Sequence, residues 1–325
     1  MNDLPKNDYP VLNSRLFISC WIGFSLDKSL TSMGDLFRRL KIGGINLDIS
    51  TFSKASKKRE INCFKNIYQK LTKKIQRKSF QKKYQVCPID STVISLTSKL
   101  LHNLGFHQAK LFSNFNSSTG LINDNLIYFG SSHDYKFGDK MISSLSKNAV
   151  GVLDRGFASK EFFKKTAELN KYFVIRISKS YKLEFVKNSD LIKVGAGKNS
   201  GLYRVVNFCD VKTKVEYRLV TNLPLIGEKS VSNAEVSEIY RQRWQIECLW
   251  KFLKMHLKLD ELITKNINGI KIQIDSTLIA YLILQIVEIP QGFGEKLLDK
   301  LGYLQACMCQ EISYVTWMNK IAKYS

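Results

Sequence analysis

Apolar residues recur at helical spacing early in the chain. Within residues 29–41 they follow one another three or four positions apart, which is typical of a helix with one buried face. Gly43 and Gly44 end this pattern, and the short side chain of Asp48 or Ser50 suits the N-cap of a second helix. We therefore predict two helices joined by a glycine turn, as in a helix-turn-helix that inserts a helix N-terminus into a DNA major groove. The alternative interpretation is a small helical bundle with a solvated basic face.

From about residue 84 the pattern changes to alternating strands and helices. Runs of β-branched and apolar residues predict strands, and a helical pattern lies between the last two of them. Such alternation is typical of an α/β sheet covered by helices. Shorter β-rich runs, broken by glycines, follow and predict a β insertion. The predicted strands are residues 84–96, 126–129, 149–153 and 172–177, the helix is residues 159–169, and the insertion strands are residues 202–208 and 215–220.

Residues 231–259 predict one long helix. Its start is well marked, because Ser232 and Glu235 have the spacing of a capping box. Apolar residues then fall on one face of the helix. Beside that face, at about 100° per residue, four polar side chains share an arc of roughly 60°. These residues are Tyr240, Arg243, Glu247 and Lys254.

Another apolar stretch, residues 278–289, contains Gln285 and Glu288 and is shorter than the roughly 20 residues of a membrane-spanning helix. We expect a buried helix there. The N-terminal residues carry no export signal or lipidation motif. Seven cysteines without a C-x-x-C pair suit a reducing cytoplasm better than a disulfide framework. The sequence thus predicts a cytoplasmic protein that does not bind membranes.

The charge of the chain indicates a polyanionic partner. Its 325 residues, enough for about two domains, carry a formal net charge of +22. From residue 54 to residue 83, twelve Lys and Arg side chains accompany a single acid, Glu60. Such a density is typical of a surface that binds the phosphates of nucleic acid. The candidate DNA contacts at the start of this run are Lys54, Lys57, Lys58 and Arg59.

Three acids suit a metal-dependent reaction on phosphodiesters. Such chemistry is best served by two metal ions about 4 Å apart, which need carboxylates converging from different elements. Asp90 ends an apolar run where an unpaired acid would be costly to bury, and Asp154 follows an apolar strand at the edge where open α/β sheets bind ligands. Glu247 on the polar stripe adds a third hard oxygen ligand. Weaker candidates, in loop-like surroundings, are Asp124, Asp134 and Asp139.

Each of these residues also has a purely structural interpretation. Asp90 would be a turn or capping acid, and Asp154 a loop acid paired with Arg155. Arg243 and Glu247 would form an i,i+4 salt bridge, worth only about 0.3–0.5 kcal/mol on an exposed helix face. In the functional interpretation, the planar guanidinium of Arg243 grips a phosphate through two hydrogen bonds.

The polar stripe resembles a known signature. The spacing of Tyr240, Arg243, Glu247 and Lys254 is similar to the Y-(2)-R-(3)-E-(6)-K signature of bacterial insertion-sequence transposases of family four. Four fixed positions within fifteen residues make this likeness quite specific.

Two further motifs support the resemblance. Residues 89–92, Ile-Asp-Ser-Thr, resemble the family's first catalytic aspartate motif, and residues 153–157, Leu-Asp-Arg-Gly-Phe, resemble the second. The order of the motifs and a β insertion before the last one also agree. The likeness spans about residues 84–290, whereas the N-terminal part matches only as a helical DNA-binding region.

The resemblance implies an α/β fold with a ribonuclease H-like mixed sheet flanked by helices. A β insertion at about residues 181–230 would precede the helix of the catalytic glutamate. The chain would divide into a helical, basic DNA-binding region, residues 1–83, and a catalytic domain, residues 84–325.

The implied activity is that of a DDE-type DNA transposase. It would cleave double-stranded DNA at the terminal inverted repeats of an insertion sequence and join the ends to target DNA, as a homodimer in the DNA complex and in association with the bacterial nucleoid. Two Mg²⁺ ions, for which Mn²⁺ can substitute, would be the cofactors. The implied catalytic metal ligands are Asp90, Asp154 and Glu247, with Arg243 and Lys254 as phosphate contacts and Tyr240 orienting the DNA or the helix.

One feature departs from the family. Members that form DNA hairpins use a Trp of the β insertion to hold a flipped base, and this chain has no Trp between Asp154 and Trp244. Tyr203 or another aromatic residue is the candidate substitute for stacking. Two other functions stay open on the sequence: a ribonuclease H-like DNA nuclease without strand transfer, and a non-catalytic or inactivated DNA-binding protein derived from a transposase.

Overall fold

The computed structural model describes residues 11–76, 83–187, 191–194, 201–210 and 214–309. Three members of the basic run, Arg77, Lys78 and Lys82, lie outside these residues. The chain divides into two compact units, and two of the four boundaries between them fall inside a strand and a helix. The helical unit is Met1–Lys78, Ile94–His107 and Lys251–Ser325, and the sheet unit is Ser79–Val93 and Gln108–Trp250.

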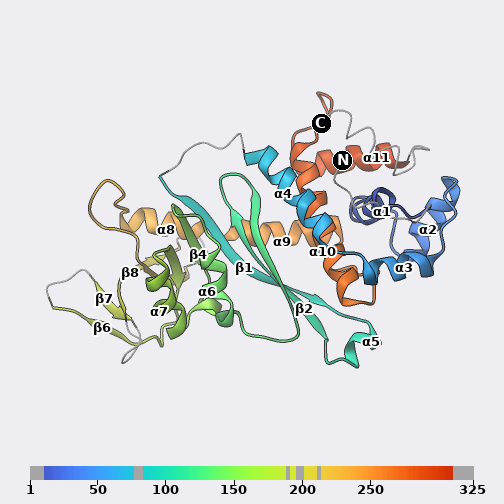
Figure 1. Ribbon diagram of the computed structural model, residues 1–325. Coiled ribbons are helices and arrows are strands. Elements are labelled where there is room, and N and C mark those ends of the chain that lie inside the picture. The colour runs from blue at the N-terminus through green and yellow to red at the C-terminus, as the bar shows by residue number, and fades with distance from the viewer. Residues whose placement is uncertain (1–10, 77–82, 188–190, 195–200, 211–213, 310–325) are drawn as a thin grey trace. The chain divides into compact units, whose positions relative to one another are not determined.

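The helical unit is organised around one buried helix, α10 (Ile267–Ile286). By length and composition α10 could cross a membrane, but 83% of its apolar window is buried inside the protein. Three N-terminal helices pack against it, and a further C-terminal helix contacts it (Figure 1). The helices of this unit are α1 (Ser14–Leu26), α2 (Met33–Ile42), α3 (Ile49–Lys58), α4 (Asn62–Gln76), α5 (Lys99–His102), α10, and α11 (Leu297–Cys309).

This grouping differs from the division drawn from the sequence at residue 83. The helices α10 and α11, assigned there to the catalytic domain, belong to the same compact unit as the N-terminal helices. The physical reason is that α10 is buried almost all round, so it needs apolar partners on every side, and α1, α3 and α4 supply them. The expectation of a buried helix is confirmed, although the helix is 20 residues long and ends at Ile286.

The two predicted N-terminal helices are present. The first, α2, ends at Gly43, and Gly44 turns the chain with a φ of 76°, which a residue without a Cβ adopts at no steric cost. The second, α3, begins after Asp48, whose carboxylate accepts a hydrogen bond from the Ser50 backbone N–H at 3.1 Å. The glycine turn and the start of the second helix therefore lie where the sequence predicts them.

The sheet unit contains one nine-stranded mixed sheet with the strand order β3-β2-β1-β4-β5-β9-β8-β7-β6. Its centre, β1-β4-β5, is parallel, and antiparallel strands extend it on both sides. The insertion strands β6 to β9 thus continue the sheet. The strands are β1 (Gln85–Ser95), β2 (Gln108–Asn116), β3 (Leu121–Phe129), β4 (Ala149–Leu153), β5 (Tyr172–Arg176), β6 (Leu183–Phe185), β7 (Ile192–Val194), β8 (Gly201–Cys209) and β9 (Glu216–Thr221).

Helices cover the two faces of this sheet (Figure 1). On one face, α6 (Gly138–Ser143) and α7 (Lys160–Leu169) pack on an aromatic-rich core that includes Phe162 and Phe173. A Cβ at Gly151 of β4 would lie 2.3 Å from Ile142 Cδ1 of α6, so a larger residue there would require this side chain to move. On the other face, α8 (Asn233–Arg241) packs its apolar residues on a separate core. The α/β, ribonuclease H-like fold predicted from the sequence is confirmed.

The prediction of one helix over residues 231–259 is wrong in one respect. The segment forms two helices, α8 and α9 (Trp244–Leu257), with a break at Gln242 and Arg243. The chain tightens there, because the N–H of Arg243 bonds to the carbonyl of Tyr240 at 3.0 Å, an i to i+3 bond instead of the α-helical i to i+4 bond. No Gly or Pro marks the break, so local sequence rules do not reveal it.

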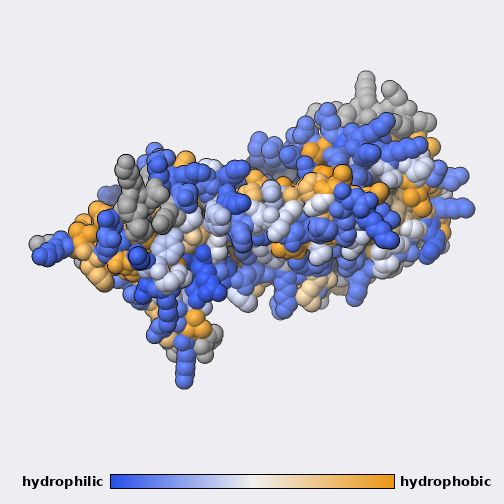
Figure 2. Space-filling view, turned by 90° about the horizontal axis from the view of Figure 1, so that it is seen from below, coloured by the Kyte–Doolittle hydropathy of each residue, from blue (hydrophilic) through white to orange (hydrophobic). Residues whose placement is uncertain are grey.

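The surface is mainly polar, as the charge of the chain requires. Figure 2 shows hydrophilic residues over most of one face, with exposed apolar residues in separate patches. Among the described residues, the most exposed large apolar side chains are Ile226, Phe185 and Ile42. Apolar side chains that are exposed in such scattered positions are ordinary on a globular surface.

Candidate active site

Two aspartates meet at the carboxyl ends of neighbouring parallel strands. The last paired residues of β1 and β4 are Ile89 and Leu153, so Asp90 and Asp154 are the next positions on the two strands. Side chains alternate between the faces of a sheet. Ile89 and Leu153 point into the core below α6 and α7. Both aspartates therefore face the side of the sheet that carries α8.

The helices on that side bring three more polar residues to the aspartates. The hydroxyl of Tyr240, at the end of α8, donates a hydrogen bond to Asp154 Oδ1 at 3.3 Å. Arg243 lies in the break, with its Nη2 2.6 Å from Oε1 of Glu247 in the first turn of α9. The Arg243 guanidinium also lies 5.9 Å from the Tyr240 ring centroid, so Asp154, Tyr240, Arg243 and Glu247 form one cluster.

Electrostatic interactions connect Asp90 to the same cluster. Burial raises the pKa of Asp90 to about 6; its backbone hydrogen bond and Arg243 work in the opposite direction, while the negative charges of Glu247 and Asp134 add to the rise. Burial opposes the charge on Arg243 too, but its neighbours Tyr240, Glu247 and Asp154 hold the pKa of the guanidinium above its ordinary value. One guanidinium thus interacts electrostatically with all three acids that the sequence singles out.

This composition fits a divalent cation. The two strand ends and the helix supply hard oxygen ligands from Asp90, Asp154 and Glu247. Three carboxylates face a single guanidinium, that of Arg243, so negative charge is in excess. Among the residues that the structure describes, no three His, Cys, Asp or Glu side chains stand close enough together to hold a metal ion as they lie. The ion pair with Arg243 explains this for Glu247, whose carboxylate is directed to the guanidinium.

A fourth acid lies next to this cluster. Asp134, the first residue of the short helix η1 (Asp134–Lys136), accepts hydrogen bonds from Ser91 Oγ at 2.9 Å and from Lys110 Nζ at 2.5 Å. From the sequence, Asp134 is only a weaker candidate for the site, because its surroundings are loop-like. No local signal reveals its position, because Ser91 and Lys110 come from other strands.

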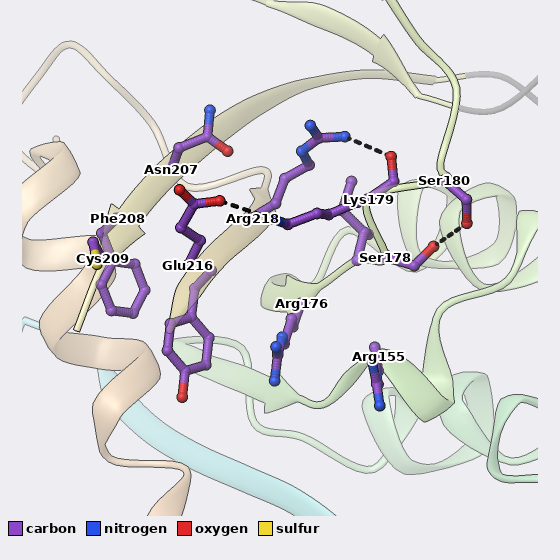
Figure 3. A pocket seen from close by; sticks show the side chains of 12 residues that line it. Arg155, Arg176, Ser178, Lys179, Ser180, Asn207, Phe208, Cys209, Glu216 and Arg218 are labelled. Atoms are coloured by element: carbon purple, nitrogen blue, oxygen red, sulfur yellow. Dashed lines mark hydrogen bonds and ion pairs between the residues drawn. The ribbon is translucent and has the colours of Figure 1, made fainter. Parts of the chain in front are cut away.

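A basic pocket opens on the same face of the sheet (Figure 3). It has a volume of about 700 Å³ and is lined by four cations and one carboxylate, Glu216, which pairs with Lys179 at 2.9 Å. Within the described part of the chain, Arg155 and Arg176 have no acidic partner. The cations of the pocket are Arg155, Arg176, Lys179 and Arg218.

An aromatic group connects the pocket to the catalytic cluster. Tyr217 of β9 stacks on Phe208 of the neighbouring β8 with ring centroids 4.8 Å apart, and Arg176 of β5 lies over the Tyr217 ring at 4.5 Å. Tyr217 also contacts Tyr240, with ring centroids 5.7 Å apart. Because β9 lies between β5 and β8, Arg176 and Phe208 flank Tyr217 from opposite sides. The sequence patterns do not single out these residues, although Arg176 is the last residue of a parallel strand and Asp154 directly follows one.

Tyr203 does not fulfil its suggested role in base stacking. Only 5% of the residue is exposed, and its hydroxyl donates to the Phe163 carbonyl at 2.7 Å. Its ring packs against Phe163 and Phe173 in the core under α7. A buried, fully packed ring has no face to offer a base.

The remaining predicted residues lie in the helical unit. The side chains of Lys54, Lys57 and Lys58 on α3 are exposed. Arg59 points inward instead: its guanidinium donates to the carbonyls of Leu12 and Asn13 and lies 4.6 Å from the Phe17 ring centroid. Lys254 of α9 lies 4.0 Å from Asp260.

Comparison with known proteins identifies the class. Residues 81–283 match the family model described as the transposase DDE domain. This match covers the sheet unit with all three candidate acids and extends into α10. The chain therefore belongs to the DDE transposase family.

The relatives narrow the class to insertion sequences. A protein of Synechocystis sp., named as a transposase for insertion sequence element IS4SA, is 49% identical over 327 residues, covering 99% of this chain and 96% of the relative. A protein of Geobacillus stearothermophilus, named as a transposase for insertion sequence element IS5377, is 24% identical over 73% of this chain and 66% of its own length. The protein is a DDE-type insertion-sequence transposase, which acts on DNA and belongs to a family that uses divalent metal ions. The resemblance stated from the sequence is confirmed.

Proposed function

We propose that Asp90, Asp154 and Glu247 hold the divalent ions with which this transposase cleaves DNA at the terminal inverted repeats and joins the ends to target DNA. The observation that carries the proposal is the register of β1 and β4, which sets Asp90 beside Asp154 on the face where Tyr240 bonds to Asp154. Glu247 is coupled to Asp90 through space and to Arg243 through an ion pair. Three acids far apart in sequence thus serve one reaction centre.

We propose Mg²⁺ as the natural ion, bound as a pair. When bound, such ions activate an oxygen nucleophile and stabilise the leaving oxygen of a phosphodiester. The carboxylate ligand set suits Mg²⁺ or Mn²⁺, because both prefer oxygen donors. The task of the protein is to hold Asp90 and Asp154 at the carboxyl ends of two rigid strands and Glu247 in the first turn of α9.

Arg243 and Tyr240 prepare this site. Arg243 forms an ion pair with Glu247, and its five N–H donors also suit a DNA phosphate in the cut-and-paste complex. Tyr240 is 4% exposed and fixes the carboxylate plane of Asp154. Lys254, from the same sequence signature, supplies a further phosphate contact.

The basic pocket continues the DNA path from the site. Arg155 directly follows Asp154, and Arg176 ends the next parallel strand, so phosphates that leave the reaction centre along this face meet cations without acidic partners. Phosphate is favoured over a stacked base as the ligand, because the Tyr217 ring is already flanked by Arg176 and Phe208. Tyr217 therefore has no free face on which a flipped base could stack.

The helical unit supplies binding to double-stranded DNA. The α2–α3 pair has the order of a helix-turn-helix, and Lys54, Lys57 and Lys58 project from α3 into solvent. We propose that this pair contacts the inverted repeat and that two copies of the chain act together on the two ends of the element. Arg59 is excluded from the DNA contacts, because it ties α3 to the start of α1.

Cleavage of a duplex that carries the element's inverted repeat tests the proposal. Wild-type protein with Mg²⁺ or Mn²⁺ should cut the duplex and should join a pre-cut 3′-OH end to target DNA. D90N, D154N and E247Q should each abolish both products but retain DNA binding. Normal cleavage by D154N would overturn the proposed site, and cleavage without joining would make the protein a nuclease.

A further inference from the structure

We propose that Asp134 is a positioning residue that fixes the two catalytic aspartates relative to each other, with Lys110 as the cation that holds Asp134 in place. The inference rests on the proposed roles of Asp90 and Asp154. It adds a fourth acid that does not bind the metal ions and acts through the segments that do.

The first contact of Asp134 fixes the Asp90 strand. Asp134 Oδ1 accepts a hydrogen bond of 2.9 Å from Ser91 Oγ, and Ser91 directly follows Asp90 in β1. This bond is made where β1 has passed the end of β4, beyond the last pair of the two strands at Ile89 and Leu153. Asp134 therefore replaces the support that β4 no longer gives.

The other oxygen of Asp134 faces the turn that follows Asp154. A Cβ built on Gly156, two residues after Asp154, would lie 3.5 Å from Asp134 Oδ2 and 3.9 Å from its Cβ. The short helices η1 and η2 (Arg155–Phe157) also pack against each other. One oxygen of this carboxylate thus accepts a hydrogen bond from the residue after Asp90, and the other faces Gly156 in the turn after Asp154.

The ion pair with Lys110 of β2 favours a structural role for Asp134 over a role as a metal ligand. Lys110 Nζ lies 2.5 Å from the same Oδ1 and donates to the Ser132 carbonyl at 3.0 Å. The Lys110 side chain is only 12% exposed, so this ion pair is shielded from solvent. Oδ1 already accepts hydrogen bonds from a hydroxyl and an ammonium, and the positive charge of the ammonium would repel a metal ion from this carboxylate.

The chain contains a matched control for this pair. Asp139 of α6 pairs with Lys165 of α7 at 2.6 Å in the same unit. Both pairs join an acid of the segment after β3 to a lysine of another element. In the described part of the chain, however, the contacts found for the Asp139 pair do not include the segments that carry Asp90 and Asp154.

The experiment measures Mn²⁺ binding to the full chain without DNA, by electron paramagnetic resonance of the free ion, together with the thermal unfolding midpoint. Wild type sets the reference, and D154N must weaken binding for the proposed function to stand. D134A is expected to weaken Mn²⁺ binding by about 10- to 100-fold, the usual effect of losing a residue that orients metal ligands. D139A should leave the affinity unchanged.

Further variants keep the inference falsifiable. S91A removes only the hydrogen bond to Asp134 and should weaken binding in the same direction, which decides the matter if D134A does not fold. K110M should also weaken it, because Asp134 loses the cation that fixes it. Wild-type affinity in D134A or S91A, or an equal loss in D139A, would overturn the inference. An unchanged affinity in D154N would instead remove the proposed metal site itself.

Discussion

Arg243 and Glu247 form an ion pair one turn apart, with 2.6 Å between Nη2 and Oε1. The pair starts in the break between α8 and α9, so the guanidinium is not in the middle of a regular helix. Its side chains are 18% and 32% exposed, which separates it from an ordinary surface salt bridge. The guanidinium of Arg243 thus places a positive charge beside one of the acids proposed to bind the divalent ions.

R243Q should lower DNA cleavage at least about tenfold, equivalent to about 1.4 kcal/mol in the barrier. The substitution removes the cation beside Glu247 and the donors for a phosphate. Initial cleavage rates at saturating Mg²⁺ measure the effect. R241Q is the matched control, because Arg241 pairs with Glu238 at 2.9 Å on an exposed part of α8. Equal rates for the two variants would contradict a special role for Arg243.

Metal affinity should depend on pH around the pKa of Asp90. Burial raises this pKa to about 6, so protons compete with the metal ion for the carboxylate over a wider pH range than at an ordinary aspartate. Mn²⁺ affinity should be level well above pH 6 and fall by up to about tenfold per unit below it. Titration of Mn²⁺ binding between pH 5 and pH 8 checks this. A profile that stays flat to pH 5 would speak against Asp90 as a ligand.

Y240F should reduce cleavage severalfold while changing stability little. The hydroxyl makes a long bond of 3.3 Å to Asp154, so its loss costs little folding energy but frees the carboxylate to rotate. Y203F is the control, because the Tyr203 hydroxyl donates a 2.7 Å hydrogen bond to the Phe163 carbonyl inside the core and has no proposed part in the reaction. We expect Y203F to lower the free energy of unfolding by about 1 kcal/mol and to cleave normally. Chemical denaturation and cleavage rates separate the two outcomes.

D275N should stabilise the protein at neutral and higher pH. Asp275 of α10 is 5% exposed, its Oδ2 has no hydrogen-bond partner, and burial raises its pKa to about 7, against the opposing effects of Lys65 and Lys271. Because this pKa is raised in the folded state, the free energy of unfolding falls as pH rises from the ordinary aspartate value to about 7. Above pH 7 it stays at the lower value. The gain for D275N should therefore be near zero at pH 4 and up to about 4 kcal/mol at pH 8.

Unfolding midpoints of D275N and wild type at the two pH values measure this gain. E295Q, which removes an exposed acid of the same unit, should show no such pH dependence. A gain that is the same at pH 4 and pH 8 would show that Asp275 is not held neutral by burial.

The three exposed lysines of α3 should account for part of the salt dependence of DNA binding. Changing Lys54, Lys57 and Lys58 together to Gln should flatten the slope of log affinity against log salt by up to about 2.7, which is 0.9 for each phosphate that a lysine no longer neutralises. Fluorescence anisotropy with the inverted-repeat duplex measures the slope. The same number of charges removed elsewhere on the helical unit controls for net charge: Lys28, Lys265 and Lys296, all exposed, changed to Gln. Equal slopes for the two triple variants would contradict an α3 contact.

Much of this protein could be predicted from local sequence patterns. The apolar run of β4 and the caps of α2, α3 and α8 depend only on neighbouring residues, and the structure confirms them. The three acids of the candidate site were singled out in the same way, from strand ends and helix spacing. Local chemistry determines such features because hydrogen bonds and side-chain directions within a few residues decide them.

Only the tertiary structure decided the rest. Strand β2, with its buried polar residues Asn114 and Asn116, has no clear apolar alternation and is stabilised by its neighbours in the sheet. The helix break at Arg243 and the association of α10 with the N-terminal helices likewise depend on partners distant in sequence. Asp134 gains its contacts only when β1, β2 and η1 come together. A sequence determines the directions of side chains along each element, but the energy of burying one element against another decides which side chains meet.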